Sequence, residues 1–240
     1  MHRIHTGQTL EPEIEVLLQG RSAHYVTRVL RVGWGEAVVL FNGDGFDYAA
    51  EVIRPGKKEI LMQVRSRLPA RAESPLHITL VQAVSRGERM DLSLQKCTEL
   101  GVAAFQPLIS ERVEVRIQPE KLGKRMAHWS RVVISACEQS GRAVVPPVYE
   151  PLTLAGWLER GSTTPRLVLE PGADTPLVKA QLKGETELVV GPEGGFNDVE
   201  LGLMRLNGIQ SVSLGPRILR TETAGPAAVA ILQTMVGDLR

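Results

Sequence analysis

The densest group of side chains that could do chemistry lies in the stretch LGPRILRTETAG, residues 214–225. Directly before an apolar segment that predicts a helix, it holds five polar residues: Arg217, Arg220, Thr221, Glu222 and Thr223. An N-cap threonine and a glutamate beside the positive end of a helix would be ordinary. Two arginines at this position are unusual, because the positive end of a helix disfavours cations. We therefore expect Arg220 to meet an anionic partner, such as an RNA phosphate or an acidic side chain.

Two glycine turns follow apolar segments that predict strands, Gly191–Gly195 after TELVV and Gly215-Pro216 after SVSL. Ligands of open α/β sheets collect outside the carboxyl ends of the strands, so both turns could line one pocket. Glycine turns are equally ordinary in such folds, and spacing alone leaves both readings open. No lysine and hydroxyl residue follow the glycines, as a phosphate-binding loop requires, and no GxGxxG opens a helix. A ligand without phosphates, held by backbone hydrogen bonds and apolar contacts, is favoured.

Other patterns that could carry chemistry are weaker. Ser93 and Lys96 match only the first element of the serine β-lactamase signature, which we attribute to chance. Arg142, after a predicted helix end at Gly141, is either a partner of the helix dipole or a phosphate contact. The five histidines lack the spacing of metal ligands, so no metal site is expected.

The net charge of +1 restricts any nucleic-acid contact to local basic patches. One such patch is RSAHYVTRVLR, residues 21–31, which is either a solvated face or a phosphate contact. The two cysteines form no CxxC pair, which favours reduced thiols in the cytoplasm. No signal peptide is recognisable, and no apolar run approaches the roughly 18 residues of a membrane helix.

The chain changes character at a proline-containing linker, residues 67–75. Before the linker, turn residues separate short strand-like runs, which predict a small β-barrel or sandwich: EIEVLL, EAVVLFNG, YAAEVI and EILMQVRS. After it, apolar runs typical of buried strands alternate with helical patterns at residues 119–141, 197–208 and 222–239. We expect an α/β domain with a parallel sheet at residues 71–240, preceded by a β domain at residues 1–70.

Five stretches together resemble the RsmE family of ribosomal RNA methyltransferases: GPEGGFNDVE, LGPRILRTETA, EQSGR, KCTELGV and HYVTRVLRVGWGEAVVLFNGDG. The resemblance extends in order over nearly the whole chain. Enzymes of this family methylate N3 of a uridine in 16S rRNA of the small ribosomal subunit. The family usually has a second histidine where this chain has Tyr25, and a serine or threonine where it has Asn197; asparagine retains the N-cap function.

The resemblance implies a SPOUT-type C-terminal domain with a deep trefoil knot, a PUA-like N-terminal β-barrel and a homodimer. It also implies S-adenosylmethionine as the cofactor, bound in the loops of the knot. Carried over position by position, the cofactor site comprises Leu169, Glu170, Gly191, Pro192, Glu193, Gly194, Leu214, Gly215, Ile218, Leu219 and Arg220. Asn197 and Glu200 are then expected to cap the next helix without touching the cofactor.

Methylation at N3 requires an unpaired or extruded base, because N3 is hidden in base pairing. We predict that Arg220 contacts the uridine or its phosphate, and that Glu222 orients Arg220 or accepts the N3 proton. RNA docking is expected on the N-terminal domain and at the predicted helix end, through Arg3, Arg21, Arg28, Arg31 and Arg142. Two alternatives stay open: a non-catalytic RNA-binding assembly factor, and a SPOUT enzyme acting on tRNA or 23S rRNA, often at a ribose 2′-OH.

Overall fold

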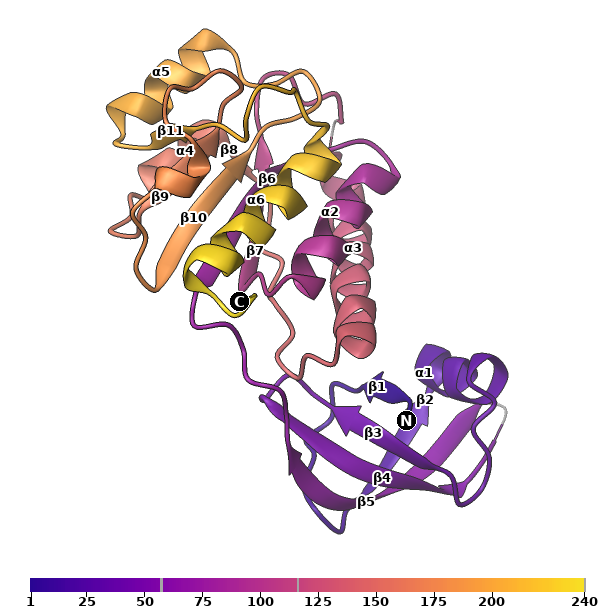
Figure 1. Ribbon diagram of the computed structural model, residues 1–240. Coiled ribbons are helices and arrows are strands. Elements are labelled where there is room, and N and C mark those ends of the chain that lie inside the picture. The colour runs from indigo at the N-terminus through magenta and orange to yellow at the C-terminus, as the bar shows by residue number, and fades with distance from the viewer. Residues whose placement is uncertain (57, 116, 240) are drawn as a thin grey trace. The chain divides into compact units, whose positions relative to one another are not determined.

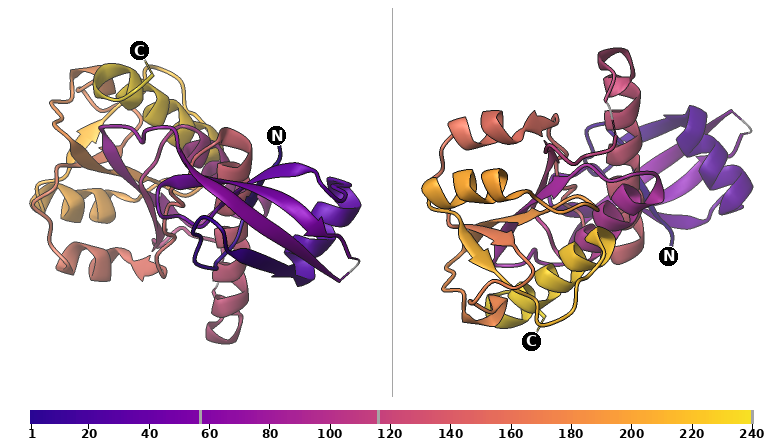
Figure 2. Two further views of the ribbon diagram at one scale, coloured as in Figure 1. Left: turned by 90° about the horizontal axis from the view of Figure 1, so that it is seen from below. Right: turned by 90° about the horizontal axis from the view of Figure 1, so that it is seen from above.

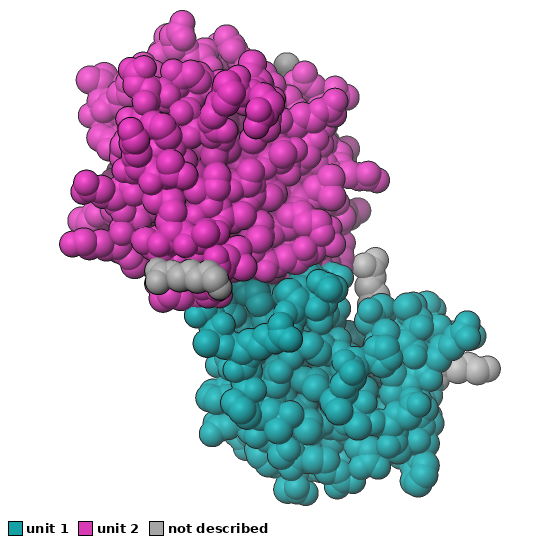
Figure 3. Space-filling view, viewed as in Figure 1, with its two compact units in different colours: residues 1–73, 134–145 teal, residues 74–133, 146–240 magenta. Residues whose placement is uncertain are grey.

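The computed structural model describes residues 1–56, 58–115 and 117–239, with only the backbone of Arg21. Contacts divide the chain into two compact units (Figure 3). The first comprises Met1–Glu73 and Ile134–Val145, and the second comprises Ser74–Val133 and Pro146–Arg240.

The first unit is built on one five-stranded sheet with the order β1-β3-β4-β5-β2 (Figure 1). Strand β1 pairs with β3 in parallel, and the other pairs are antiparallel. Its elements are β1 (Arg3–His5), β2 (Glu15–Gln19), α1 (Gly20–His24), the π-helix η1 (Tyr25–Val29), β3 (Ala37–Phe41), β4 (Phe46–Arg54) and β5 (Glu59–Pro69). The four strands expected from sequence are confirmed, and β1 is added to them.

Alternation along the strands explains the core of this unit. In β4, Tyr48, Ala50 and Val52 are buried while the residues between them are not, as a strand with one covered face requires. The helical segment α1–η1 is absent from the sequence-based expectation. Its sequence is weak in helix propensity because it contains β-branched residues, and its second half forms a π-helical turn. Burial of Ala23 and Val26 in the same core stabilises it instead.

The second unit contains a six-stranded, entirely parallel sheet with the order β11-β9-β10-β6-β7-β8. The strands are β6 (His77–Ala83), β7 (Ala104–Ile109), β8 (Leu152–Thr153), β9 (Arg166–Leu169), β10 (Glu185–Val190) and β11 (Gln210–Val212). The expected parallel α/β sheet is therefore confirmed. The carboxyl ends of its strands share one edge of the sheet, which is where the glycine turns after β10 and β11 begin.

Helices cover both faces of this sheet (Figure 1, Figure 2). The helices that follow β6 in the chain are α2 (Glu88–Glu99), α3 (Pro119–Ser140), α4 (Leu154–Glu159), the short 3-10 helix η2 (Leu177–Lys179), α5 (Asp198–Leu206) and α6 (Thr221–Val236). Val81 and Val189 pack on one face with Trp157 of α4 and Met204 of α5. Leu80 and Gln82, which neighbour Val81 in β6, lie next to Gly225 of α6 on the opposite face, as strand alternation requires.

The predicted apolar face of α3 is confirmed at Trp129 and Val133, which are buried, with Leu122 and Met126 partly buried. None of the helices in the described part of the chain is both long and apolar enough to cross a bilayer.

Helix α6 differs from expectation at its start. The sequence would tolerate Pro226 only in the first turn, but α6 begins at Thr221, which makes Pro226 its sixth residue. Proline has no N–H, so the carbonyl of Glu222 lacks its usual intrahelical bond. The expectation of a threonine N-cap is also wrong, because Arg220 holds the N-cap position without a side-chain cap bond.

Candidate active site

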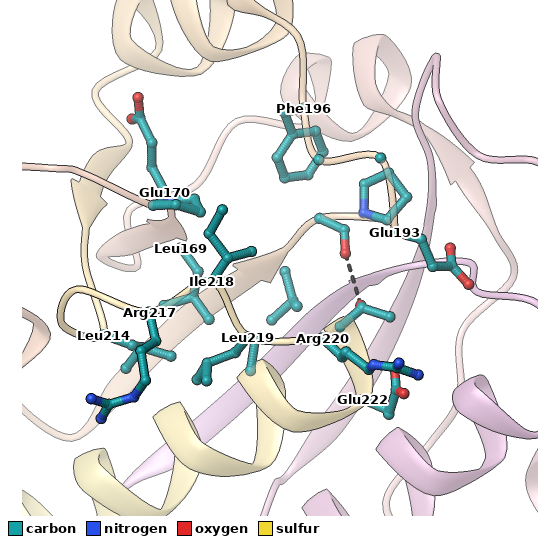
Figure 4. Close-up of a pocket in the computed structure, with 18 of the residues that line it drawn as sticks. Leu169, Glu170, Glu193, Phe196, Leu214, Arg217, Ile218, Leu219, Arg220 and Glu222 are labelled. Atoms are coloured by element: carbon teal, nitrogen blue, oxygen red, sulfur yellow. Dashed lines mark hydrogen bonds between the residues drawn. The ribbon is translucent and has the colours of Figure 1, made fainter.

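A cavity of about 750 Å³ lies at the carboxyl edge of the parallel sheet (Figure 4). Its walls come from three segments that follow neighbouring strands: Leu169–Pro171 after β9, Gly191–Phe196 after β10, and residues 214–224 after β11. The three segments meet because β11, β9 and β10 are adjacent and parallel.

All the cofactor-site residues that the resemblance pointed to line this cavity: Leu169, Glu170, Gly191, Pro192, Glu193, Gly194, Leu214, Gly215, Ile218, Leu219 and Arg220. Glu222 lines it as well, together with Arg89 and Phe196, which the sequence did not single out as site residues. Their common location is a finding, whereas their roles stay predictions.

The glycine loop after β10 is a tight turn closed by a hydrogen bond from the Gly195 amide to the Pro192 carbonyl, 2.9 Å. Gly195 has φ +65°, a conformation that side chains with a Cβ rarely adopt. A Cβ at Gly191 would lie 3.3 Å from ring atoms of Phe196. Glycine is needed at these two positions for different reasons, conformation at one and close approach at the other.

The exit of this loop is held by the predicted capping box. Asn197 Oδ1 accepts a hydrogen bond from the Glu200 amide at 2.8 Å, and Glu200 Oε2 accepts one from the Asn197 amide at 3.0 Å. Glu200 is buried, and its Oε1 accepts a further bond from the Glu111 amide at 2.8 Å. The expectation that Asn197 and Glu200 cap α5 is confirmed, and neither is among the cavity-lining residues.

Thr221 joins three elements beneath the cavity. Its hydroxyl donates to the Gly191 carbonyl at 2.8 Å, drawn as the dashed line in Figure 4, and accepts from Nε2 of Gln82 at 2.9 Å. The start of α6 is thereby tied to the glycine loop and to β6. This use of the hydroxyl explains why Thr221 does not cap the helix.

Arg220 and Glu222 project from the start of α6 to the same end of the cavity, and Arg217 lies at the other end (Figure 4). The Arg220 side chain is exposed. The Glu222 side chain is only 16% exposed, and its Oε2 is buried with no hydrogen-bond partner among the described residues. A buried carboxylate oxygen without a partner is costly, which singles out Glu222 as a candidate functional group of this cavity.

Arg89, in the first turn of α2, reaches the same end of the cavity. Its Nη1 donates to Glu193 Oε1 at 2.9 Å, and its Nε lies 3.9 Å from Glu222 Oε1. Burial raises the pKa of Glu193, but hydrogen bonds from Arg89 and from the Glu193 and Arg86 amides outweigh it, and the pKa is lowered. The glycine loop therefore carries a fixed negative charge at neutral pH.

The cavity lining combines four acidic side chains, Glu170, Glu193, Asp198 and Glu222, with three arginines. The lining is therefore slightly acidic when all these groups are charged, and it contains no lysine. A small cationic ligand suits such a site better than a phosphate does. In the described residues, no group of three or more His, Cys, Asp and Glu side chains is placed to hold a metal ion.

The arginines proposed for RNA docking fall into two groups. Arg28 and Arg31 are exposed, and neither forms an ion pair in the part of the chain that the structure describes. Arg3 instead pairs with Asp47 and donates to the Arg142 carbonyl at 3.0 Å, and the buried Arg142 pairs with Glu73. The side chain of Arg21 lies outside the described part.

An exposed tryptophan, missed in the sequence, follows the basic segment. Trp34 is 74% exposed within a turn in which the Gly33 amide donates to Glu36 Oε2 at 2.6 Å. The turn is also tied to β4 by a bond from the Gly35 amide to the Val52 carbonyl, 2.8 Å. A rigid turn thus presents a large aromatic ring to solvent. The low aromatic content of the chain gave little reason to expect such a surface.

Comparison with known proteins assigns both parts of the chain. The RNA methyltransferase domain family matches residues 72–233, and the RNA methyltransferase PUA domain family matches residues 18–64. Ribosomal RNA small subunit methyltransferase E of Synechocystis sp. is 35% identical over 233 residues, which cover 93% of this chain and 74% of that protein. The protein of the same name from Buchnera aphidicola is 32% identical over 240 residues, covering 99% and 95%.

A solved structure extends the likeness to the whole fold. Ribosomal RNA small subunit methyltransferase E from Neisseria gonorrhoeae, crystallised with bound S-adenosyl methionine, has a TM-score of 0.93 and 38% identity, with all of both chains covered. The expected fold class, a SPOUT-type α/β domain preceded by a PUA-like β domain, is thereby confirmed. The chain belongs to the RsmE family of ribosomal RNA methyltransferases.

Proposed function

We propose that this protein is an S-adenosylmethionine-dependent enzyme that methylates N3 of a specific uridine in 16S rRNA of the small ribosomal subunit. The observation that carries the proposal is the cavity at the carboxyl edge of the sheet, where the glycine loop meets Arg220 and Glu222. The relatives are named as small-subunit rRNA methyltransferases, and the Neisseria protein binds S-adenosyl methionine.

The residues present fit this cofactor. The cavity volume lies within the usual range for small-molecule sites. The backbone of Gly191–Gly195 and the apolar side chains of Leu169, Leu214 and Leu219 would hold its neutral parts. The slightly acidic lining suits a ligand with a positively charged sulfonium. When bound, the cofactor supplies an activated methyl group.

The protein's own residues then have to accept one proton and stabilise one developing negative charge. Uracil N3 carries a proton that must leave, and the remaining negative charge is shared with the flanking oxygens O2 and O4. The unpartnered Oε2 of Glu222 is the proposed acceptor of that proton. The Arg220 guanidinium is the proposed contact of the uridine or its phosphate and stabilises the charge that develops.

We also propose a division of labour along the chain. Residues 1–70 form the RNA-binding domain, with Arg28 and Arg31 contacting phosphates and Trp34 stacking on an unpaired base. Arg3 pairs with Asp47 inside this domain, whereas Arg142 lies outside residues 1–70 and pairs with Glu73. Residues 71–240 form the methyltransferase domain, threaded as a trefoil knot, in a cytoplasmic homodimer. Its RNA partner is 16S rRNA within the small ribosomal subunit.

Single-turnover methylation of small subunits at saturating cofactor tests the assignment. Glu222→Gln and Arg220→Gln should each lower the rate by about 10²–10⁴-fold, because each removes a group that acts in the transfer. Glu159→Gln, an exposed glutamate at the end of α4, is the matched control and should react normally. Near-wild-type rates for both Glu222→Gln and Arg220→Gln would refute these roles.

Two further measurements separate the alternatives. Nucleoside analysis of the product should show 3-methyluridine; a 2′-O-methylated ribose would instead indicate the other kind of SPOUT enzyme. Calorimetry with S-adenosylmethionine should show binding, and a protein without cofactor affinity would be the non-catalytic assembly factor.

A further inference from the structure

Arg89 occupies a position that its helix disfavours. It is the second residue of α2, where the positive end of the helix dipole repels a cation. Two carboxylates offset this repulsion, Glu193 from the glycine loop and Glu222 from α6. Arg89 is therefore placed by its interactions across the cavity rather than by its own helix.

The guanidinium is held firmly on one side only. Glu193 Oε1 accepts bonds from Arg89 Nη1 at 2.9 Å and from the Arg86 amide at 3.1 Å, so the carboxylate has two anchors. The hydrogen bond to Glu193 raises the pKa of Arg89, with the charge of Glu222 adding to the effect. On its other side, Arg89 Nε lies 3.9 Å from Glu222 Oε1, close enough for ionic attraction but too far for a hydrogen bond.

This arrangement treats the two oxygens of Glu222 differently. Oε1 faces the Arg89 guanidinium, whereas Oε2 is buried and has no hydrogen-bond partner among the described residues. A cation beside Oε1 therefore fixes the orientation of the carboxylate. Other charged groups of this region are Arg220 on the same helix end, Glu193 on the loop, Arg112, which donates to the Gly194 carbonyl at 2.9 Å, and the Arg86–Glu114 pair.

We propose that Arg89 is a positioning residue of the methyl transfer, anchored by Glu193 and fixing the orientation of the Glu222 carboxylate through its Oε1. The proposal rests on the proposed function. It links the loop that would hold the cofactor to the group that would take the proton, through one side chain. Ordering of the glycine loop by a cofactor would then also order Glu222.

The test is the pH dependence of single-turnover methylation. Arg89→Met removes the positive charge beside the Glu222 carboxylate and should move the acid limb of the rate upward by about one pH unit. At pH values below both limbs the rate loss should be about 10-fold greater than at pH 8, following that shift. Arg86→Met is the matched control, because it removes an arginine whose side chain pairs with Glu114 and keeps the backbone amide. Arg86→Met should leave the acid limb of the rate at its wild-type pH.

Three readouts keep the test decisive. Arg89→Lys, which retains the charge, should restore most of the wild-type limb even though the hydrogen bond from Nη1 is lost. Glu193→Gln, which frees Arg89 from its anchor, should shift the limb in the same direction as Arg89→Met. In a Glu222→Gln background, Arg89→Met should cause no further pH shift, because the two residues act as a unit.

Failure of the inference is distinct from failure of the proposed function. If Arg89→Met lowered the rate equally at every pH, Arg89 would be merely structural and the inference overturned. Wild-type protein that bound S-adenosylmethionine and formed 3-methyluridine would leave the proposed function intact in that case. If the wild type neither bound the cofactor nor formed this product, the proposed function itself would fall.

Discussion

Glu222 and Arg220 stand two positions apart at the start of α6, yet they meet different surroundings. Arg220 is exposed, whereas Glu222 is mostly buried, with one oxygen that has no hydrogen-bond partner in the described part of the chain. The sequence indicated that arginines before a helix need an anionic partner. It could not indicate Arg89, because that residue lies about 130 positions upstream and reaches Glu222 only through the fold. The chemistry of this end of the cavity is therefore a product of tertiary structure.

The ion pair of Glu193 with Arg89 should make the free energy of unfolding depend on pH. The pKa of Glu193 is lowered in the folded protein, so the stabilisation is present above the unfolded pKa, near 4.5, and is lost as pH falls through the folded value. Glu193→Gln should therefore lower the free energy of unfolding at pH 7 by about 0.5–1 kcal/mol, a modest effect because the Arg89 partner is partly exposed.

Urea unfolding at pH 7 and pH 3.5 measures this effect. The difference between wild type and Glu193→Gln should shrink at the lower pH, because the carboxyl group of the unfolded wild type is then mostly protonated and the stabilisation declines. Glu159→Gln provides a baseline for the loss of an exposed glutamate. A difference of the same size at both pH values would contradict the assigned ion pair.

At the scale of elements, the predictable features are those with local causes. The apolar runs of β6, β7, β9 and β10, and the capping box before α5, could be read directly from the sequence. The segment α1–η1 could not, because its helical form depends on burial in the sheet's core rather than on propensity. Pro226 in the second turn of α6 shows the same limit, since the helix start is set by the bonds of Thr221 to distant elements.

The exit of the glycine loop predicts an element-scale effect. Asn197→Ala removes the N-cap bond of α5 and the contact with Glu111, and should lower the free energy of unfolding by about 1 kcal/mol or more. Asn197→Ser keeps a capping oxygen and should stay close to wild type. Thermal unfolding with the two variants side by side measures the difference.

The same pair of variants also reports on the loop. Loss of the cap should weaken S-adenosylmethionine binding in Asn197→Ala, although Asn197 does not line the cavity, because the loop's exit is no longer held. Equal stability and equal cofactor affinity for the alanine and serine variants would show that the capping box does not support the loop.

At the scale of the whole molecule, the two units carry separable properties. The second unit contains every residue of the cavity, and the exposed arginines Arg28 and Arg31 belong to the first. Family membership covers both, with one domain match in each part of the chain. The sequence could not show which arginines of the first unit are exposed. Arg3 and Arg142 match the basic pattern, but Arg3 forms an ion pair with Asp47 and Arg142 with Glu73.

The division predicts that RNA affinity and cofactor affinity can be changed independently. Arg28→Glu with Arg31→Glu should weaken binding of 16S rRNA and flatten its dependence on salt, because each phosphate contact to single-stranded RNA contributes about 0.7 to the slope of log K against log salt. Cofactor affinity should be unchanged. Charge reversal at Arg131, an exposed arginine on α3, is the matched control.

Trp34→Ala separates stacking from charge in the same experiment. Loss of a stacked base should weaken binding by about 1–3 kcal/mol without altering the slope, because no charge is removed. The double arginine variant should change the slope, and the tryptophan variant should change only the intercept. An unchanged salt slope in the double variant would remove Arg28 and Arg31 from the RNA surface, and unchanged affinity in Trp34→Ala would leave the exposed ring without a role in RNA binding.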